Sequence, residues 1–513
     1  MDFLPVLLAL LPVAVIFLLL ILRRTAADVA GLVGWVVAVG IAWLYFQTPL
    51  SVTLRASLAG IVASLPIALV VATSLLQVTI MLETGAIARV VVLIKSVAPG
   101  EQVVQIMLIN VGFGTLLTAL GAVPVSILPP IMLALGYSSF AAIALPAIGY
   151  DALCTYALLG TPVVVFASFA GQPVDQVGSI FASYMPVIST CIALGMLWIV
   201  GRWELVWRGL VPALVAGLTA GFIAIGMNAL RMVTLTGIAA GLGVVLAMLA
   251  YLKVTGRPLV DRGGQDLAAG RRLSLGAAVS PWIILTFFSL LVNVPFLPFF
   301  DLTFRRLAMP LEVIPGAPEK VRLFWQAYFW ILVSTLLALP FLKPTRGQLS
   351  MSLRKWLKRA PRPVLAAAVF FAIAFIINHS GKGTDWQLAD PSHNMIHVVA
   401  GASAAAFGRL YPLIAPFLGL LGGFISGSET SSIAMLTALH LSTAERIGAA
   451  GLLVAAASGI GGGLASVISP AKLQNASASI DRIGEEAQVI RTTFVVSLVI
   501  TAVCALVTLL WAF

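Results

Sequence analysis

The chain has 513 residues, of which 60% are hydrophobic and only 10% are charged, and its mean hydropathy is +1.08. A soluble protein is about one-quarter charged, so this composition excludes a soluble globular protein and indicates a polytopic membrane protein. The net charge of +11 does not indicate nucleic-acid binding, because the excess lies in loops, where the positive-inside rule accounts for it. Cys154, Cys191 and Cys504 all fall in apolar segments, which indicates small core residues rather than a disulfide framework.

The first apolar run, residues 3–22, is long enough to cross the hydrocarbon core. Arg23 and Arg24 follow this run instead of preceding it, so we expect a retained span and not a secretory signal. Two further spans are expected at about 29–46 and 56–82. The mixed stretch 83–102 has the length and charge of a helix that lies near the membrane interface.

A first broken region extends from residue 103 to residue 170. It stays apolar but is interrupted by many helix-breaking residues, namely Gly112, Gly114, Gly121, Pro124, Pro129, Pro130, Pro146, Gly160 and Pro162. Such a density of glycine and proline predicts discontinuous helices.

The remaining spans follow in order, with a second broken region at about 397–478. We expect them at about 177–200, 210–229, 232–252, 275–294, 323–342, 364–377 and 489–513. Segment 253–272 carries five basic and two acidic residues, and segment 343–362 carries seven basic residues and no acid. These two loops, with Arg23 and Arg24, are therefore predicted to be cytoplasmic, which places the N-terminus outside.

The two broken regions align with each other after a shift of about 308 residues. The shift places 160–162 over 468–470 and 115–124 over 423–432, and the predicted topology enters the two regions from opposite sides. We therefore expect an all-α membrane protein of about twelve spans plus re-entrant hairpins, arranged as two inverted repeats. The expected divisions are 1–55 (N-terminal spans), 56–252 (first repeat, hairpin at 113–130), 253–362 (connecting spans and basic loops) and 363–513 (second repeat, hairpin at 417–435).

The second hairpin, FLGLLGGFISGSETSS at 417–432, places one carboxyl and five hydroxyls inside an apolar region. A broken helix offers free backbone N–H groups that favour an anion. The expected substrate contacts here are Ser426, Gly427, Ser428, Thr430 and Ser431. Glu429 is the first candidate for proton coupling, because intramembrane acids are functional by default. The alternative is a helix start, with Ser428 as the N-cap and Glu429 in the first turn.

The first hairpin, TLLTALGAVPVS at 115–126, contains no acid. By symmetry we expect Thr118, Gly121 and Ser126 to contact substrate, although small residues that pack helices together would look the same. Asp151 is the only acid between Glu101 and Asp175, and it is the second candidate for proton coupling. Tyr150 and Tyr156 are its candidate hydrogen-bond partners, and a loop position between two half-helices is the alternative.

The counterpart in the second repeat is SGIGGGLASVISPAK at 458–472. Its glycine run allows close backbone approach, Ser469-Pro470 is expected to end a helix, and Ser469 is a candidate substrate contact. Lys472 could neutralise an anion, but extension of its side chain to the interface is the favoured interpretation. His393 and His397 are four residues apart, yet no further ligand accompanies them, so neither a metal nor another cofactor is expected.

These elements of the C-terminal third resemble the lactate permease family, within the wider ion transporter superfamily. The resemblance is carried by 417–432, by the LLVAAA run at 452–457, by Gly461–Gly463 and by Ile468-Ser469-Pro470. The family pattern has a near-identical FLG…TGSDTSSN hairpin and a later ISPQ. A weaker likeness covers 111–208. The resemblance implies uptake of L-lactate, D-lactate or glycolate by proton symport across a bacterial inner membrane.

Three positions depart from the family pattern. The first hairpin lacks the glutamate of the family's EGAAGFGAP-like run, Ala471 replaces the glutamine of ISPQ, and Ile433 replaces the asparagine after the second hairpin. Asp151 is the candidate to take over the role of the missing acid. The expected function is therefore proton symport of a small monocarboxylate, with a sodium-coupled organic-anion carrier and an anion channel as alternatives. We expect no enzymatic activity. The expected partners are a small organic anion, protons and the lipid bilayer but no nucleic acid, and a homodimer is compatible with the sequence.

Overall fold

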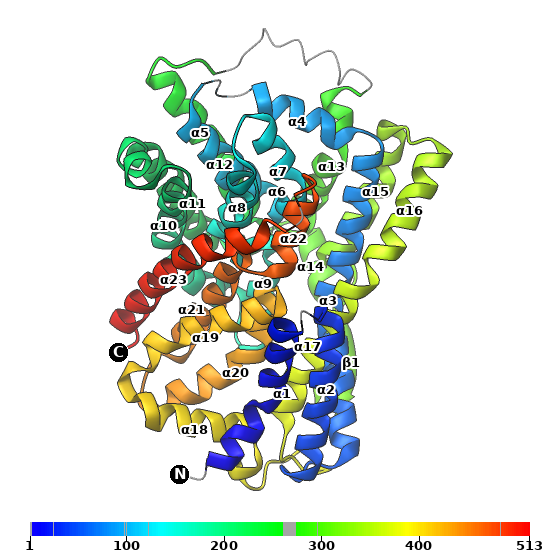
Figure 1. Cartoon of the computed structure of the whole chain (residues 1–513). Coiled ribbons are helices and arrows are strands. Elements are labelled where there is room, and N and C mark those ends of the chain that lie inside the picture. The colour runs from blue at the N-terminus through cyan, green and yellow to red at the C-terminus, as the bar shows by residue number, and fades with distance from the viewer. Residues whose placement is uncertain are drawn as a thin grey trace.

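The computed structural model describes residues 3–23, 25–96, 98, 100–121, 123–259, 273–294, 296–482 and 484–513. Most of the basic loop predicted at 253–272, together with Arg24 and Ala122 of the first hairpin, lies outside these residues. The described part of the chain is built almost entirely from helices (Figure 1).

The helices up to residue 254 are α1 (Phe3–Leu22), α2 (Ala27–Leu44), α3 (Leu50–Glu83), α4 (Ala86–Ser96), α5 (Gln102–Ile106), η1 (Met107–Phe113), α6 (Gly114–Ala119), α7 (Pro124–Ala134), α8 (Ser139–Gly149), η2 (Tyr150–Tyr156), α9 (Ala157–Ala170), α10 (Val174–Arg208), α11 (Leu210–Ala229), η3 (Val233–Leu235) and α12 (Thr236–Val254).

The later elements are α13 (Leu275–Asn293), α14 (Pro298–Asp301), η5 (Leu302–Arg306), strands β1 (Met309–Ile314) and β2 (Ala317–Val321), α15 (Ala327–Leu342), α16 (Arg346–Arg359), α17 (Pro361–His379), η6 (Pro391–His393), α18 (Met395–Phe407), η7 (Gly408–Leu410), α19 (Tyr411–Ser426), α20 (Glu429–Ile447), α21 (Gly451–Leu464), η8 (Ala465–Val467), α22 (Pro470–Ala478) and α23 (Glu486–Trp511).

Within the described residues, eleven helical segments are long and apolar enough to cross a membrane, and α1, α2 and α15 are shorter apolar helices. The expectation of an all-α polytopic membrane protein is confirmed. The predicted spans 56–82, 177–200, 210–229, 232–252 and 489–513 coincide with α3, α10, α11, α12 and α23, although α3 and α10 are longer than predicted. The helix α4 is short and amphipathic in sequence, as expected for the stretch between 83 and 102.

Helix α3 joins several parts of the fold. It has 34 residues, which corresponds to about 50 Å of helix. Figure 1 shows α15 and α16 beside the C-terminal part of α3, while α17 packs along its N-terminal part. On α16, Trp356 donates a hydrogen bond to the backbone of Ala72 at 2.8 Å, and Lys355 forms an ion pair with Glu83. The basic segment 343–362 is thus largely a helix that lies against α3.

The same order of elements occurs twice along the chain. The first series contains α3, α4, the hairpin of α6 and α7, α8, η2, α9 and α10. The second contains α17, α18, the hairpin of α19 and α20, α21, η8, α22 and α23. The paired elements are separated by roughly the predicted shift, with α5 and η1 before α6 and η7 before α19, and the internal repeat stays a prediction. The inverted orientation of the repeats in the membrane stays a prediction.

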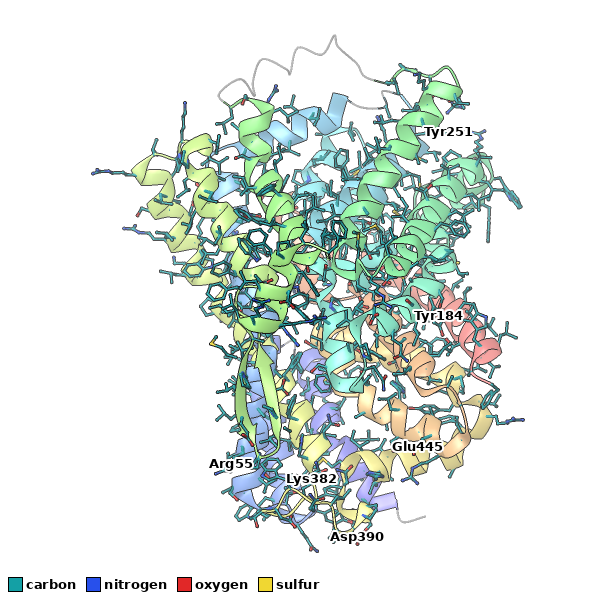
Figure 2. The ribbon with its side chains drawn as sticks, turned by 180° about the vertical axis from the view of Figure 1, so that it is seen from behind. Arg55, Tyr184, Tyr251, Lys382, Asp390 and Glu445 are labelled. Atoms are coloured by element: carbon teal, nitrogen blue, oxygen red, sulfur yellow. The ribbon has the colours of Figure 1, made fainter. Side chains whose placement is uncertain are left out.

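The segment between α13 and α15 contains a small β-hairpin that sequence reasoning did not anticipate. Strands β1 and β2 pair antiparallel, with Met309 opposite Val321 and Leu311 opposite Glu319. Ile314 packs with Val52 and Ala56 at the start of α3. In Figure 2 the hairpin lies toward the end of the molecule that carries the labels Arg55 and Lys382, away from Tyr251.

Candidate functional site

The second hairpin is broken at its tip, as the sequence predicted. Helix α19 ends at Ser426, and Gly427 adopts a left-handed conformation with φ of 67°, which glycine accepts without steric cost. Helix α20 then begins at Glu429, where the Ser428 hydroxyl accepts the N–H of Ser431 at 3.3 Å. The interpretation of Ser428 as an N-cap is therefore confirmed, but the cap leaves Glu429 inside the protein.

The Glu429 carboxyl is buried, with 4% of the residue exposed. Its Oε1 accepts a hydrogen bond from the Thr155 hydroxyl at 2.7 Å. Its Oε2 is buried and accepts no hydrogen bond of good geometry in the described structure, although the Cys154 thiol lies close to the carboxyl. A Cβ atom added to Gly463 would lie 2.7 Å from this Oε2, so the third glycine of the GGG run makes room for the carboxyl.

Residues 150–160 bring the first repeat to this carboxyl. They form the irregular helix η2 and then three consecutive left-handed residues, Leu158, Leu159 and Gly160, with φ of 52°, 56° and 73°. Left-handed backbone at leucine costs roughly 1–2 kcal/mol per residue, and such strain accumulates where the surrounding structure enforces it. The segment packs against α6 on one side and against α20 and α21 on the other.

Asp151 is also buried, with 4% exposed. Neither of its carboxylate oxygens accepts a hydrogen bond of good geometry from the described residues, although the Ser466 hydroxyl and the Cys154 thiol lie close to the carboxyl. The expectation that Tyr150 or Tyr156 would bind it is wrong, because the Tyr150 hydroxyl accepts from Lys472 and the Tyr156 hydroxyl donates to the backbone of Gly178. Both tyrosines are directed to other partners by the packing of η2.

Lys472 points into the protein, so the expectation that it extends to the membrane interface is wrong. Its ammonium group donates to the Tyr150 hydroxyl at 2.6 Å and to the Ser466 hydroxyl at 2.5 Å. It is near enough to act electrostatically on both Asp151 and Glu429. The reason is the break before α22, after which that helix packs against α7 and α8, close to Tyr150.

We call Asp151, Glu429 and Lys472 the buried charge cluster, in which the two carboxyls are buried and the Lys472 side chain is half-buried. It unites residues from both repeats around hydroxyl groups of Thr155 and Ser466, neither of which was predicted. Thr155 lies four residues after Asp151, and Ser466 lies six residues before Lys472, so both belong to stretches that the sequence singled out. Serine and threonine are common in apolar helices, however, and no sequence pattern distinguished these two from the others. A buried cluster of this kind can hold or release protons and can neutralise an anion.

The tip of the second hairpin meets the other predicted break of the second repeat. The Cβ position of Gly427 is 3.4 Å from the Ser469 hydroxyl, and Ser469, Thr430 and Ser431 are all buried. The Ser426 hydroxyl donates to the carbonyls of Gly422 and Ser428, at 2.8 and 2.9 Å. The predicted contacts of the second repeat are thus gathered beside the charge cluster.

The predicted residues of the first hairpin have different neighbours. The Thr118 hydroxyl donates to the backbone of Gly114 at 2.8 Å. Gly121 lies against Ser74 of α3 and Ile331 of α15. Ser126 belongs to α7, but its side chain is outside the described part of the structure. The described contacts of Thr118 and Gly121 therefore lie on α3, α6 and α15, and segment 150–170 connects this region with the second hairpin.

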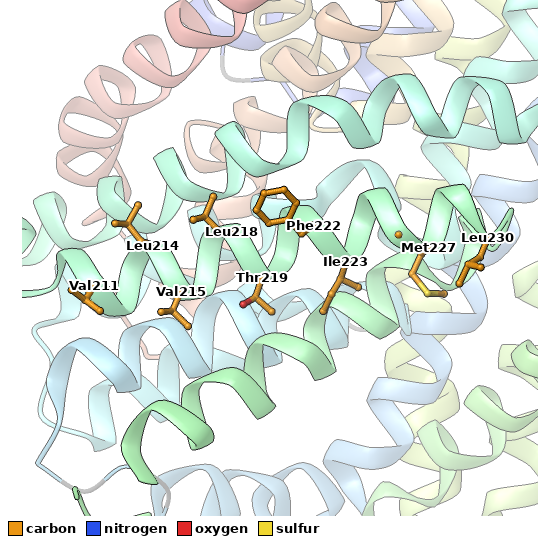
Figure 3. Close-up of a pocket in the computed structure, with 10 residues that line it drawn as sticks. Val211, Leu214, Val215, Leu218, Thr219, Phe222, Ile223, Met227 and Leu230 are labelled. Carbon is orange, nitrogen blue, oxygen red and sulfur yellow. The ribbon is translucent and has the colours of Figure 1, made fainter. Parts of the chain in front are cut away.

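A groove on the outer surface of α11 offers no comparable chemistry (Figure 3). It has a volume of about 790 Å³ and is lined by aliphatic, aromatic and glycine residues with Thr219 as its one hydroxyl. An open apolar surface on a membrane helix is suited to lipid. It contains no group that would hold an anion.

Comparison with known proteins agrees with the resemblance seen in the sequence. The profile of the L-lactate permease family matches residues 5–513. The glycolate permease GlcA of Escherichia coli K12 is 25% identical over 99% of this chain and 95% of its own length. The L-lactate permease of the same strain is 27% identical over 99% of this chain and 96% of its own length.

Among solved structures, MtrF of Neisseria gonorrhoeae matches 90% of this chain and 84% of its own, with a TM-score of 0.44 and 13% identity, a likeness too low to bear on the fold. The family match is nearly complete in length and agrees with the eleven apolar helices. The chain therefore belongs to the L-lactate permease family and is a multi-pass protein of the inner membrane.

Proposed function

We propose that this protein takes up a small 2-hydroxy monocarboxylate, such as lactate or glycolate, together with protons. The names of the glycolate and L-lactate permeases support the substrate class and a transporter rather than an enzyme. The proton coupling rests on the buried charge cluster.

The observation that carries the proposal is the charge balance of this cluster. Among the described residues, it contains one ammonium group, that of Lys472, and two carboxyls, those of Asp151 and Glu429. Unbalanced charge inside a membrane protein is costly. The empty site is balanced when one carboxyl is ionised and the other holds a proton.

A substrate carboxylate changes this balance. When it binds near Lys472, the ionised carboxyl must take up a proton for the site to stay neutral. When the substrate leaves, the carboxyl ionises again and pairs electrostatically with Lys472. Substrate anion and proton then move together, one for one, and transport carries no net charge. The cycle alternates access by movement around the helix breaks.

The proposed substrate contacts surround this cluster. Hydroxyl and backbone groups at the hairpin tip are suited to a carboxylate and a 2-hydroxyl group. The proposed set is Ser426, Gly427, Ser428, Thr430, Ser431 and Ser469 near the cluster, with Thr118, Gly121 and Ser126 of the first hairpin included by symmetry.

The ammonium group of Lys472 also affects which coupling ion the site can accept. A sodium site needs several oxygen ligands around a positive charge, and a resident ammonium beside the same carboxyls repels a second cation. Protonation removes charge from a carboxyl without adding a cation to the site. This favours protons over sodium.

Uptake into proteoliposomes tests the proposal. Uptake of labelled lactate and glycolate is measured beside that of unsubstituted acetate and propionate. Each substrate is tested under an imposed pH gradient, under a sodium gradient at constant pH, and with the membrane potential clamped. We expect lactate or glycolate to accumulate with the pH gradient, independently of the potential. Accumulation that requires sodium would establish a sodium-coupled carrier, and uptake that never exceeds the solute's own gradient would establish a channel.

A further inference from the structure

A cavity of about 800 Å³ lies between the segment that joins α13 to α15 and the helices α3 and α9. The predicted topology places this joining segment on the outer side of the membrane. The lining combines apolar residues of α3 and α9 with polar and charged residues of the joining segment, among them Glu319, Arg322 and Gln326. Its polar lining distinguishes it from the apolar groove on α11.

Arg322 is the one arginine of this cavity that forms no direct ion pair with a described acid. Arg231 forms an ion pair with Asp175 at 3.6 Å, and Arg305 pairs at 3.3 Å with Asp301, which also pairs with Arg306. The Arg322 guanidinium is held in place by a hydrogen bond from Nε to the backbone of Phe304 at 3.0 Å and by the Phe304 ring, 4.2 Å away. These contacts fix its orientation and leave its two terminal nitrogen atoms for an anion.

Trp325 adds a second, independent donor. Only 6% of this residue is exposed, and its buried indole N–H has no acceptor among the described residues. An unpaired buried donor is costly, and a ligand oxygen would satisfy it. Trp325 lines this cavity and also a narrow neighbouring cavity.

The narrow cavity lies between the large cavity and the left-handed break of α9. It shares Thr161, Val164 and Trp325 with the large cavity and adds Leu158 and Leu159 of the left-handed break. Its volume is only about 10 Å³, enough for about one water molecule. Thr155, which binds Glu429, lies three residues before Leu158. The break therefore connects the part of the chain that lines the narrow cavity with the part that reaches the cluster.

We propose that the large cavity is the vestibule through which the substrate anion reaches the buried cluster, and that Arg322 and Trp325 bind its carboxylate on the way. The left-handed break at residues 158–160 is the constriction that must open. The substrate class rests on the proposed function, whereas the anion preference of the vestibule does not.

Cysteine labelling tests the vestibule without measuring transport. Val164 is half-buried and lines both cavities, so Val164→Cys places a thiol between them. Rates of modification are measured with an anionic and a cationic methanethiosulfonate reagent on the purified full-length protein, with the unsubstituted chain as background. The ratio of the two rates reports the local preference for anions.

We expect Arg322→Gln to lower the anionic-to-cationic ratio by about tenfold, the smaller end of the range for electrostatic focusing in clefts. Arg322→Lys keeps the charge and should keep most of the ratio. Arg55→Gln removes an exposed arginine of α3 that does not line the cavity, and it should change nothing. An unchanged ratio in Arg322→Gln, or no labelling of Val164→Cys, would overturn the vestibule.

Lactate is then added as a competitor, and lactate uptake is measured with the same preparations. Lactate should slow the labelling of Val164→Cys, and less so with Arg322→Gln, which should also raise KM for uptake and leave the maximal rate nearly unchanged. Intact uptake without any effect of Arg322 on labelling would refute the vestibule alone. A clear effect on labelling in a protein that takes up no hydroxy acid would refute the proposed function alone.

Discussion

Thr155 donates a hydrogen bond to Glu429 at 2.7 Å, although 274 positions separate the two residues in the chain. This contact joins the irregular helix η2 of the first repeat to the hairpin tip of the second. A carboxyl that could change its protonation is thereby held by one hydroxyl at Oε1, while Oε2 accepts no hydrogen bond of good geometry from the described residues. Movement of either repeat relative to the other would alter this hydrogen bond.

Replacement of Glu429 by glutamine should separate transport from the proton gradient. Glutamine has nearly the same shape and cannot ionise, so accumulation driven by a pH gradient should fall to background while exchange of labelled for unlabelled substrate continues. Uptake and exchange in proteoliposomes measure the two activities. Glu445→Gln, on the exposed face of the same helix, is the control. Normal pH-driven accumulation in the Glu429 variant would exclude Glu429 from coupling.

Asp151→Asn tests whether the second buried acid replaces the one missing from the first hairpin. If Asp151 is the carboxyl that ionises when the substrate leaves, the asparagine variant should lose the dependence of uptake on pH. The initial rate of uptake is measured across a pH series and compared with that of Glu429→Gln. Unchanged pH dependence would remove Asp151 from the mechanism and leave Glu429 alone.

Thr155→Val should weaken uptake by roughly tenfold or more, because a hydrogen bond to a charged group contributes about 1.5–3 kcal/mol. Thr155→Ser keeps the hydroxyl and should retain most of the activity. The ratio kcat/KM for uptake is measured for both variants, and thermal unfolding in detergent controls for stability. Equal activities of the valine and serine variants would contradict a role for this hydrogen bond.

Gly463→Ala should impair uptake through a steric conflict with Glu429. The added methyl group would lie 2.7 Å from Oε2, and such overpacking costs about 1–3 kcal/mol. The shorter carboxyl of Glu429→Asp should relieve the conflict, so the double variant should be more active than additivity predicts. Gly226→Ala, where no atom lies within 4 Å of the new methyl group, is the control. Strict additivity would contradict the contact.

The anion preference of the vestibule should increase as the pH falls. Burial raises the pKa of Glu319, so this carboxyl takes up a proton at a higher pH than an ordinary glutamate and leaves the positive charge of Arg322 less opposed. Asp175, Arg231 and Arg305 line the same cavity. The anionic-to-cationic labelling ratio of Val164→Cys should therefore rise on acidification from neutral pH.

With Glu319→Gln this ratio should be high at every pH and change little. Use of the ratio cancels the direct effect of pH on the thiol, since both reagents depend equally on its ionisation. A ratio in the glutamine variant that varies with pH as in the parent would assign the effect to another group.

The sequence by itself determined the membrane class, the approximate spans and the places where helices break. Length and hydropathy decide whether a segment can cross the bilayer, and Gly427 and Ser469-Pro470 act on the backbone at their own positions. The hairpin motif at 426–432 also identified the family. All of these are local properties, so they can be found in the order of the residues.

Only the tertiary structure decided which side chains meet. Lys472 turns toward Tyr150 and Ser466 because α22 packs against α7 and α8, and Thr155 reaches Glu429 because α9 packs against α20. The position of Arg322 in the lining of a cavity also depends on the tertiary structure, because the joining segment covers that cavity. These relationships depend on how helices far apart in the chain rotate and pack, and the hydropathy of a segment contains almost no information about that rotation.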